Sequence, residues 1–299
     1  FILVRKSKTV IISPIMSGFS KLLKILNVIR TTQILHGNKM SYFFFFFLTH
    51  CMNFTLRKIR PLGFFLKKVF VYLPTSEFII KNSQGTWAVF PFNDGMTISA
   101  DYFEEELRGW PGKVSQRRIF IDAGANIGKY TIIASNIFNY SQVLSIEPNP
   151  ITADLLKRNI TLNKLEHKTS VEQVAIGDTE GEVIIQSDSH HLGGANIVDV
   201  YDTGKPKKDI SCNVKISTLD SIILNKKLDP SEIDFIKIDI ERMEKKALEG
   251  MRVILASMPR KSGVMIEITN DRSKVIDILS NHGFRQVENI ADDYLFIKA

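Results

Sequence analysis

A strand–helix alternation that begins at residue 118 is the feature that most limits how this 299-residue chain can fold. The run Arg118–Asp122 predicts a strand because it is rich in β-branched and aromatic residues, and Ile127–Phe138 predicts a helix. Further strands are predicted at Gln142–Glu147, Val171–Ile176, Glu182–Gln186, Asn213–Ile216, Phe235–Asp239, Val264–Ile268 and Tyr294–Lys298, and further helices at Thr152–Leu162, Glu244–Leu255 and Lys274–Asn281. Because strands that alternate with amphipathic helices pair in parallel, we expect an α/β fold, with a doubly wound, mostly parallel sheet covered on both faces.

The segment before this alternation is predicted to form an accessory unit over residues 77–117. Phe78–Lys81 and Thr86–Phe90 flank Ser83-Gln84-Gly85 and predict a hairpin, and Ala100–Arg108 has acidic helical character. Trp110-Pro111-Gly112 is expected to end that helix. The main domain is then expected to span residues 118–299.

Residues 1–76 differ from the rest of the chain in charge. They carry twelve Lys and Arg residues, no Asp or Glu and eleven of the twenty phenylalanines, which leaves 27 basic and 32 acidic residues in 77–299. We expect this leader to be disordered or to contact a membrane surface peripherally, because its apolar run Tyr42–Leu48 is too short to span a bilayer. Since the chain starts at Phe1 rather than Met, a fragment or an over-extended reading frame is also expected.

The composition limits the class of protein and its partners. With 44% hydrophobic and 24% charged residues, the chain is neither wholly disordered, nor collagen-like, nor a polytopic membrane protein. The body after the leader is mildly acidic, so no nucleic-acid partner is expected. Cys51 and Cys212 are too few for a disulfide framework or a Cys-rich zinc site, which favours a reducing, cytoplasmic compartment and no metal.

The most informative motif follows the first predicted strand, in Ile119-Phe-Ile-Asp-Ala-Gly-Ala-Asn-Ile-Gly-Lys-Tyr-Thr131. It is not a phosphate-binding loop, because three residues rather than four separate Gly124 from Gly128 and neither Ser nor Thr follows the lysine directly. It also lacks the Gly-x-Gly-x-x-Gly of dinucleotide-binding folds, because the third place counted from Gly124 is Asn126. What remains is an acid at a strand end followed by Gly-x-x-x-Gly.

This pattern suits S-adenosylmethionine, which carries an ammonium, a sulfonium, a ribose diol and an adenine but no pyrophosphate. Gly124 would let the backbone approach a ligand closely, and Gly128 would let the helix start tight against the sheet. Asp122 would meet a positive group in the crevice where open α/β sheets bind ligands. A generic strand–turn–helix connection is the plainer alternative.

Two later strand ends complete the predicted cofactor site. Glu147 would accept hydrogen bonds from the ribose diol, and Pro148 would set a stiff turn before the next helix. Ala175 and Ile176 would enclose the adenine. The plainer alternatives are a helix-capping acid at Glu147 and a simple β-turn after Ile176.

Five motifs occur in order along the chain: Asp122-Ala-Gly-Ala-Asn-Ile-Gly-Lys-Tyr-Thr131, Glu147-Pro-Asn-Pro150, Ala175-Ile-Gly-Asp178, Thr218-Leu-Asp-Ser221 and Ile233-Asp-Phe-Ile-Lys-Ile-Asp-Ile-Glu241. Together they resemble the FkbM-type methyltransferases, a branch of the class I S-adenosylmethionine-dependent enzymes. The resemblance implies a Rossmann-like seven-stranded sheet with an antiparallel final strand, and O-methylation of a hydroxyl on a small natural product, a sugar or a glycan. The predicted cofactor-binding residues are Asp122, Gly124, Ala125, Asn126, Gly128, Glu147, Pro148, Ala175 and Ile176.

One departure from the family pattern concerns the residue after Glu241. The family usually has Asp-Val/Ile-Glu-Gly-x-Glu here, whereas this chain has Asp239-Ile-Glu-Arg-Met-Glu244. If this position requires a positive φ, Arg242 is strained. Alternatively, Arg242 points into the crevice and pairs with a neighbouring glutamate or an anionic substrate.

Methyl transfer to a hydroxyl benefits from a base that takes the acceptor's proton. Asp239, Glu241 and Glu267 are the catalytic candidates, because each lies at the predicted carboxyl edge of the sheet, where clustered carboxylates raise one another's pKa. In the plainer alternative, Asp239 orders its loop and Glu241 is an acid near a helix N-terminus. Two other functions remain open: an RNA methyltransferase on the same fold, and a non-catalytic S-adenosylmethionine-binding protein.

Overall fold

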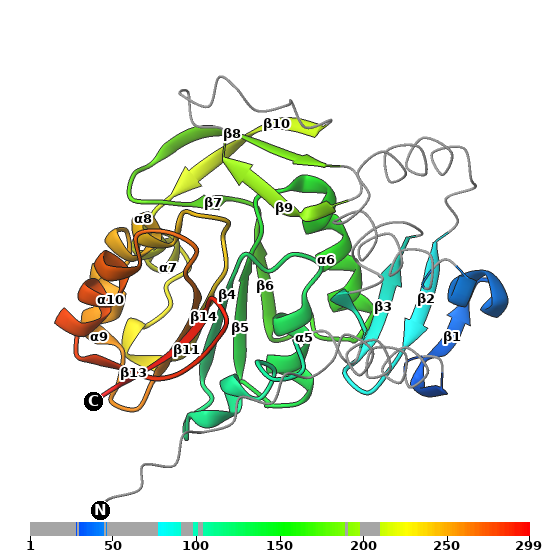
Figure 1. Cartoon of the computed structure of the whole chain (residues 1–299), viewed down its shortest axis with the longest axis horizontal. Helices are drawn as coiled ribbons and strands as arrows, with labels where there is room; N and C mark the ends of the chain where they lie inside the picture. The colour runs from blue at the N-terminus through cyan, green and yellow to red at the C-terminus, as the bar shows by residue number, and fades with distance from the viewer. Residues whose placement is uncertain are drawn as a thin grey trace, which may run out of the picture.

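The computed structural model describes residues 28, 30–44, 46, 77–90, 98–100, 104–188, 191–197 and 210–299. The strands in this part of the chain form a seven-stranded, a four-stranded and a three-stranded sheet (Figure 1). The seven-stranded sheet lies in the middle with helices on both faces. The four-stranded sheet lies beyond one end of its strands, and the three-stranded sheet lies to one side of it.

The seven-stranded sheet has the strand order β13-β14-β12-β11-β4-β5-β6. Its strands are β4 (Ile119–Ala123), β5 (Gln142–Ile146), β6 (Thr169–Glu172), β11 (Ile233–Ile238), β12 (Gly263–Glu267), β13 (Phe284–Ile290) and β14 (Asp293–Lys298). The strands from β6 to β12 in this order are parallel, and β14 runs antiparallel to both β12 and β13. This confirms the predicted sheet and its antiparallel final strand. The sequence analysis missed β13 because only Phe284 in it is buried.

Helices cover both faces of this sheet, as its apolar strands require. They are α5 (Lys129–Asn136), α6 (Pro150–Leu162), α7 (Leu219–Asn225), α8 (Glu244–Glu249), α9 (Arg252–Ser257) and α10 (Arg272–Asn281), with short 3-10 turns η1 (Trp110–Lys113) and η2 (Pro230–Glu232). Ile119 and Ile121 of β4 pack in a core with α7 to α10, whereas Phe120 packs on the opposite side with α5. Because successive side chains of β4 point to opposite faces of the sheet, this strand contributes to the core on both faces.

The strand order reverses at β4, because β5 lies on one side of it and β11 on the other. Ligands of open α/β sheets bind at such a switch point, beyond the carboxyl ends of the strands. The Gly124 loop and the loop after β11 meet here.

The four-stranded sheet, of order β7-β10-β8-β9, begins at the same edge. Its strands are β7 (Ala175–Ile176), β8 (Gly181–Asp188), β9 (His191–Ile197) and β10 (Ile210–Ser217). Only two residues separate β6 from β7, so this sheet starts where the central sheet ends. The predicted strand Val171–Ile176 is therefore wrong as one strand, because it divides between two sheets.

The three-stranded sheet contains β1 (Gln33–His36), β2 (Phe78–Lys81) and β3 (Thr86–Val89). The hairpin of β2 with β3 agrees with the expected one. The strand β1 pairs with β2, and Tyr42 and Phe46 are buried in a core with Phe78. The described part of residues 1–76 thus packs on the accessory unit and is not disordered. Its expected contact with a membrane surface stays a prediction, and the rest of that segment lies outside the described residues.

Two predicted helices differ from the structure. Residues 104–109 form hydrogen-bonded turns rather than part of a helix Ala100–Arg108, and 101–103 lie outside the described residues. The predicted helix Glu244–Leu255 is divided into α8 and α9 at Gly250, whose Cα approaches the Gly177 carbonyl too closely for a side chain. Among the described residues, no helix has the length and apolar character needed to cross a bilayer.

Candidate active site

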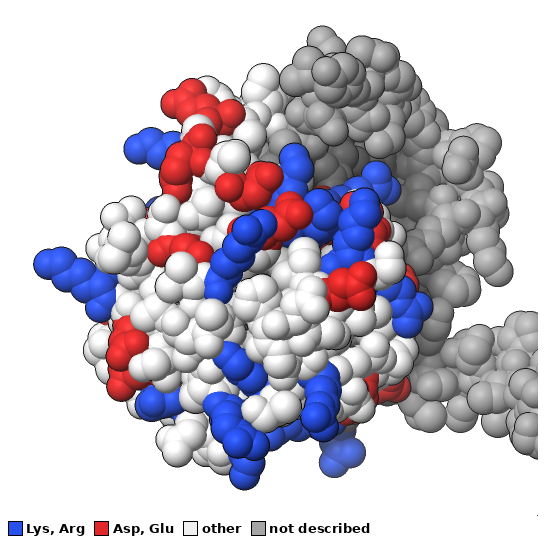
Figure 2. Space-filling view, turned by 90° about the vertical axis from the view of Figure 1, so that its left-hand side faces the viewer, with Lys and Arg blue, Asp and Glu red and all other residues white. Residues whose placement is uncertain are grey.

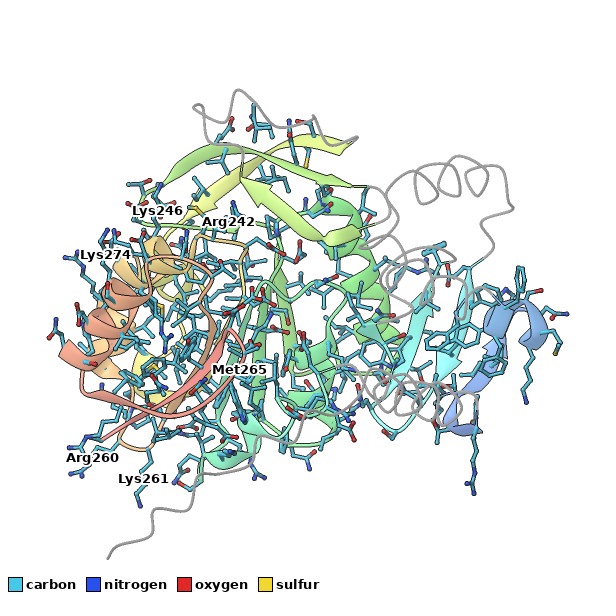
Figure 3. All side chains as sticks on the ribbon, in the orientation of Figure 1. Arg242, Lys246, Arg260, Lys261, Met265 and Lys274 are labelled. Atoms are coloured by element: carbon cyan, nitrogen blue, oxygen red, sulfur yellow. The ribbon has the colours of Figure 1, made fainter. Side chains whose placement is uncertain are left out.

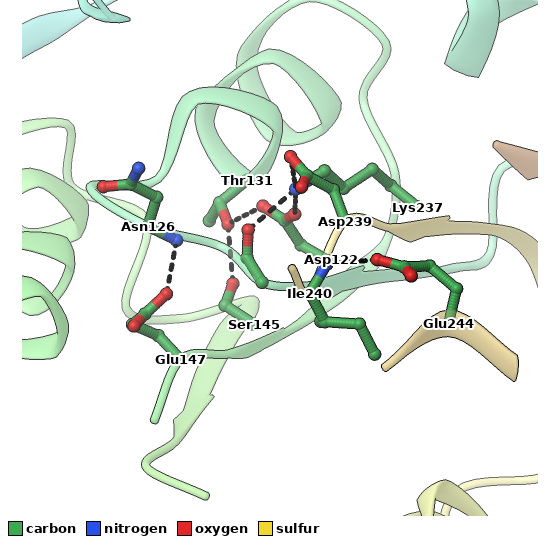
Figure 4. Close-up of polar contacts among 10 residues, drawn as sticks. Asp122, Asn126, Thr131, Ser145, Glu147, Lys237, Asp239, Ile240 and Glu244 are labelled. Atoms are coloured by element: carbon green, nitrogen blue, oxygen red, sulfur yellow. Dashed lines mark hydrogen bonds and ion pairs between the residues drawn. The ribbon is translucent and has the colours of Figure 1, made fainter. Parts of the chain in front are cut away.

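Asp122 lies at the carboxyl end of β4 and is completely buried. The Thr131 hydroxyl donates a hydrogen bond of 2.6 Å to Asp122 Oδ2 and lies 2.7 Å from the Ser145 hydroxyl (Figure 4). Lys237 Nζ lies 3.8 Å from Asp122 Oδ1. Burial raises the pKa of Asp122, while Lys237 and Thr131 oppose that rise. Asp122 thereby ties β4 to β5, β11 and the first turn of α5.

Lys237 is the cation at the centre of this network, and the sequence analysis missed it. It is 4% exposed, donates a 2.7 Å hydrogen bond to the Gly124 carbonyl and lies 3.3 Å from Asp239 Oδ2. Burial by itself lowers the pKa of Lys237, but the carboxylates of Asp239, Asp122 and Glu104 outweigh burial and raise it. The available signal was a lysine in a strand that is buried along its whole length, because a buried lysine must be paired. The positive group that faces Asp122 is therefore a side chain of the protein.

The two glycines of the motif are required for different reasons. Gly124 has a φ of +76°, and a Cβ there would lie 1.8 Å from the Asp239 carbonyl oxygen. Gly128 begins α5 with a φ of +97°, and a Cβ there would lie 2.7 Å from Leu156 of α6. Glycine at position 124 lets the loop after β11 approach closely. Glycine at position 128 lets α6, rather than the sheet as expected, pack against the start of α5.

Glu147, at the end of β5, organises the loop between β4 and α5. Its Oε2 accepts a 2.9 Å hydrogen bond from the Asn126 backbone N–H, and its Oε1 accepts one of 2.9 Å from the Asn149 backbone N–H. Burial raises the pKa of Glu147 to about 7, and these backbone hydrogen bonds limit the rise. Asn126 itself has a φ of +51°, and its side-chain Oδ1 is buried without a hydrogen-bond partner among the described residues.

The other predicted cofactor residues are near this loop or on the second sheet. Ala125 is buried, and its N–H donates to the Ile146 carbonyl at 3.0 Å, while Pro148 is half-buried after Glu147. Ala175 and Ile176 are buried in β7, so they lie in the four-stranded sheet and not at the end of the third central strand. Ala175 packs with β8 and β10, and Ile176 packs in the main core.

The loop after β11 has two consecutive residues in the left-handed region, Glu241 at +54° and Arg242 at +80°. The position of Arg242 thus requires a positive φ, as the family's glycine indicated. Glu244 supports this loop: its Oε1 accepts hydrogen bonds from the backbone N–H groups of Ile240 at 3.4 Å and Arg242 at 3.1 Å. The Arg242 side chain is exposed at the start of α8 (Figure 3).

Carboxyl groups from several elements meet beside Lys237. Burial first, and then the charges of Asp239, Asp293 and Glu241, raise the pKa of Glu267 to about 8. Asp239, Glu241 and Glu267 thus lie near one another, although the Asp239 side chain is 39% exposed, and their catalytic role stays a prediction. Glu104, which precedes β4, joins this group with a pKa raised by burial.

Asp293 of β14 was not predicted because it follows an exposed turn rather than a parallel strand. Burial and the charges of Glu104 and Asp239 raise its pKa to about 7. Among the residues the structure describes, no group of three or more His, Cys, Asp or Glu side chains is placed to hold a metal ion. The raised pKa values of Glu267 and Asp293 suit these carboxyl groups to accept a proton near neutral pH.

The chain matches one protein family and is similar to several known proteins. The model of the Methyltransferase FkbM domain matches residues 122–286. Methyltransferase sdnD of Sordaria araneosa is 24% identical over 153 residues, which are 44% of this chain and 59% of that protein. A tRNA (guanine(37)-N(1))-methyltransferase of Methanocaldococcus jannaschii is 37% identical over 75 residues, 24% of this chain and 21% of that protein. The solved methyltransferase FkbM of Methylobacillus flagellatus KT has a TM-score of 0.42 at 16% identity, covering 68% of this chain and 53% of that chain.

S-adenosylmethionine is the cofactor of this family, and the residues at the switch point fit its groups. Each Glu147 carboxylate oxygen accepts one backbone N–H and retains a lone pair for a ribose hydroxyl. The unpartnered Asn126 Oδ1 can accept from a further donor. The role of each residue toward the cofactor stays a prediction. With its characteristic motif at the switch point and the domain match over more than half of its length, the chain belongs to the FkbM methyltransferase family.

Proposed function

We propose that this chain transfers a methyl group from S-adenosylmethionine to a hydroxyl oxygen of a small natural product or a sugar. The observation that supports this proposal is the group of acids at the carboxyl edge, in which Glu267 has a pKa of about 8. A hydroxyl must lose its proton when it is methylated, and a base whose pKa lies near the working pH performs that step best. The matched regions span only part of each curated relative, so the acceptor is argued from the site alone.

In this proposal the residues at the switch point divide the work. Glu147 and the Asn126 loop hold the adenosyl part, and Asp122 with Lys237 keeps the Gly124 loop in place. When bound, the cofactor supplies a methyl group on a sulfonium, whose sulfur departs with the bonding electron pair. Much of the rate would come from holding the acceptor oxygen about 3 Å from the methyl carbon.

Glu267 is the base in this proposal, and Asp239 and Glu241 are the carboxylates near it. The Glu267 carboxylate accepts the hydroxyl proton and becomes a carboxylic acid, while the acceptor oxygen becomes an ether. Asp239 pairs with Lys237, so in this proposal it orients the acceptor hydroxyl group and does not take its proton.

The test is a screen of metabolites and sugars with a radiolabelled methyl donor, followed by Glu267→Gln. We expect Glu267→Gln to lower kcat about 10²- to 10⁴-fold, the usual contribution of a general base, and to leave the affinity for S-adenosylhomocysteine unchanged by calorimetry. Glu249→Gln, in the half-buried ion pair with Lys245 on α8, is the matched control and should keep full activity. Full activity of Glu267→Gln would exclude it as the base, and no transfer to any acceptor would favour a non-catalytic cofactor-binding protein.

RNA is the second candidate acceptor, because the local similarity to a tRNA methyltransferase covers 75 residues. The charge of the chain argues against it: residues 77–299 carry five more acidic than basic residues. On the face shown in Figure 2, Lys and Arg are interspersed with Asp and Glu and do not form one continuous basic surface. Binding of bulk tRNA that weakens steeply between 50 and 200 mM salt would favour RNA over a small molecule.

A further inference from the structure

Glu267 ends β12 and Asp293 begins β14, and the two residues are direct partners in the antiparallel ladder. Side chains directly opposite one another in such a ladder share a face, with Cβ atoms about 4.5–5.5 Å apart. Two acids placed in this way repel each other, so the pair is unfavourable for stability. The pair lies at the carboxyl edge, next to Asp239 of the neighbouring strand end.

Charged groups from several other elements face this pair. Those that face Glu267 are Asp239, Glu241 and Glu244, and those that face Asp293 are Glu104, Asp239, Lys237 and Asp292. Burial raises both pKa values first, and the surrounding carboxylates add to the rise, while Lys237 lowers the pKa of Asp293. Each of the two carboxyl groups is therefore harder to ionise when the other is charged.

Tyr130 is a further group beside these acids. It is 3% exposed, and its hydroxyl interacts with the Glu104 carboxyl group. Burial, followed by the charges of Glu104, Asp293 and Asp239, raises the pKa of Tyr130 well above the usual value, so it stays protonated.

We propose that Glu267 and Asp293 work as one carboxyl pair, in which Glu267 takes the acceptor's proton and Asp293, as a positioning residue, controls the pH at which Glu267 is free to do so. This role rests on the proposed function, whereas the coupling between the two carboxyl groups does not. One proton moves in the step: it leaves the acceptor hydroxyl and binds a Glu267 oxygen. Asp293 exchanges no proton with the acceptor.

The coupling is tested in the protein alone, without cofactor or acceptor, by following the carboxyl ¹³C shift of Glu267 against pH. The signal is identified by its loss in Glu267→Gln. In Asp293→Asn we expect the apparent pKa of Glu267 to fall by about one unit, because a like charge opposite it is removed. Asp292→Asn is the matched control: Asp292 is exposed, so its charge is screened, and the shift should be no more than about a third as large.

An unchanged pKa of Glu267 in Asp293→Asn, or an equal shift in both variants, would overturn the pairing. If Asp293→Asn does not fold, the wild-type titration decides, because a coupled pair titrates in two steps, whereas a single step at the ordinary glutamate value contradicts it. Once the acceptor is known, the acid limb of the kcat profile should move to lower pH in Asp293→Asn and stay in place in Asp292→Asn. If Asp293→Asn shifts the pKa of Glu267 but leaves the kcat profile unchanged, the two carboxyl groups are coupled but Glu267 is not the base.

Discussion

Gly124 and Gly283 both lie in the left-handed region, with φ of +76° and +83°, but their surroundings differ. A Cβ on Gly283 would have no atom within 4 Å, whereas a Cβ on Gly124 would collide with the Asp239 carbonyl. Both positions therefore require a positive φ, but only Gly124 also has a neighbouring atom too close for a side chain. Gly124 therefore lets the loop after β4 lie directly against the loop after β11.

This difference predicts two distinct results for the same substitution. Gly283→Ala should lower the free energy of unfolding by about 1–2 kcal/mol, the cost of a side chain in the left-handed region. Gly124→Ala should cost clearly more, because the loop must also move away from Asp239. Urea unfolding of both variants measures this; equal losses would show that the close contact contributes nothing.

Arg242 shows how the chain tolerates a residue where its family usually has glycine. Its φ of +80° is unfavourable for arginine, but Glu244 accepts hydrogen bonds from two backbone N–H groups of the same turn. Only one oxygen of Glu244 is used, and Oε2 is buried without a partner among the described residues. The loop is thus held by its backbone, and the exposed arginine side chain is not needed to shape it.

At the scale of elements, α6 joins the accessory sheet to the central one. Asn159 accepts a 2.7 Å hydrogen bond from the Ala88 backbone N–H of β3 and donates one of 2.9 Å to the Ile127 carbonyl. Asn163, one turn later, accepts from the backbone N–H of Thr86 at 2.8 Å and donates to its carbonyl at 2.7 Å. These side-chain amides satisfy an edge of β3 that would otherwise be unpaired.

We therefore expect Asn159→Ala to destabilise the protein by about 2–4 kcal/mol, because it leaves a buried N–H and a buried carbonyl unsatisfied. Asn225→Ala, at an exposed position of α7, is the control and should change the free energy of unfolding by less than about 0.5 kcal/mol. Both are measured by urea unfolding. A loss in Asn159→Ala as small as that of the control would mean that β3 is held by apolar packing alone.

At the scale of the whole molecule, the raised carboxyl groups predict how stability depends on pH. In the folded protein Glu147, Glu267 and Asp293 titrate at about 7, 8 and 7, against ordinary values of 4.5, 4.5 and 3.8. The folded state thus binds more protons than the unfolded state between about pH 4 and 8. The free energy of unfolding should therefore fall as pH rises through this window. Exposed acids with lowered pKa values, such as Asp271, act only below it.

Urea unfolding at intervals from pH 5.5 to 8.5 measures this dependence. Glu267→Gln combined with Asp293→Asn should give a shallower slope, because two of the groups no longer titrate. A free energy of unfolding that rises with pH over this window in the wild-type protein would show that the pKa values of Glu147, Glu267 and Asp293 are not raised in the folded state.

Local patterns were sufficient for the parallel core and for the loop that marks the site. The glycine motif, the acid after β5, the acids after β11 and the acid that ends β12 all lie at the ends of buried strands, and parallel strands bring their carboxyl ends to one edge. Patterns failed where an element has little apolar surface, as in β13, or where one apolar run serves two sheets, as in Val171–Ile176.

The amino-acid sequence by itself determined the fold class, the family and the edge of the sheet where the site lies, because these depend on periodicity and on short contiguous motifs. Only the tertiary structure decided that Lys237 neutralises Asp122, that Gly124 lies directly against the loop after β11, and that Asp293 is opposite Glu267. Each of these contacts joins residues distant in the chain. Charge pairing and burial depend on distances in space, which no local pattern contains.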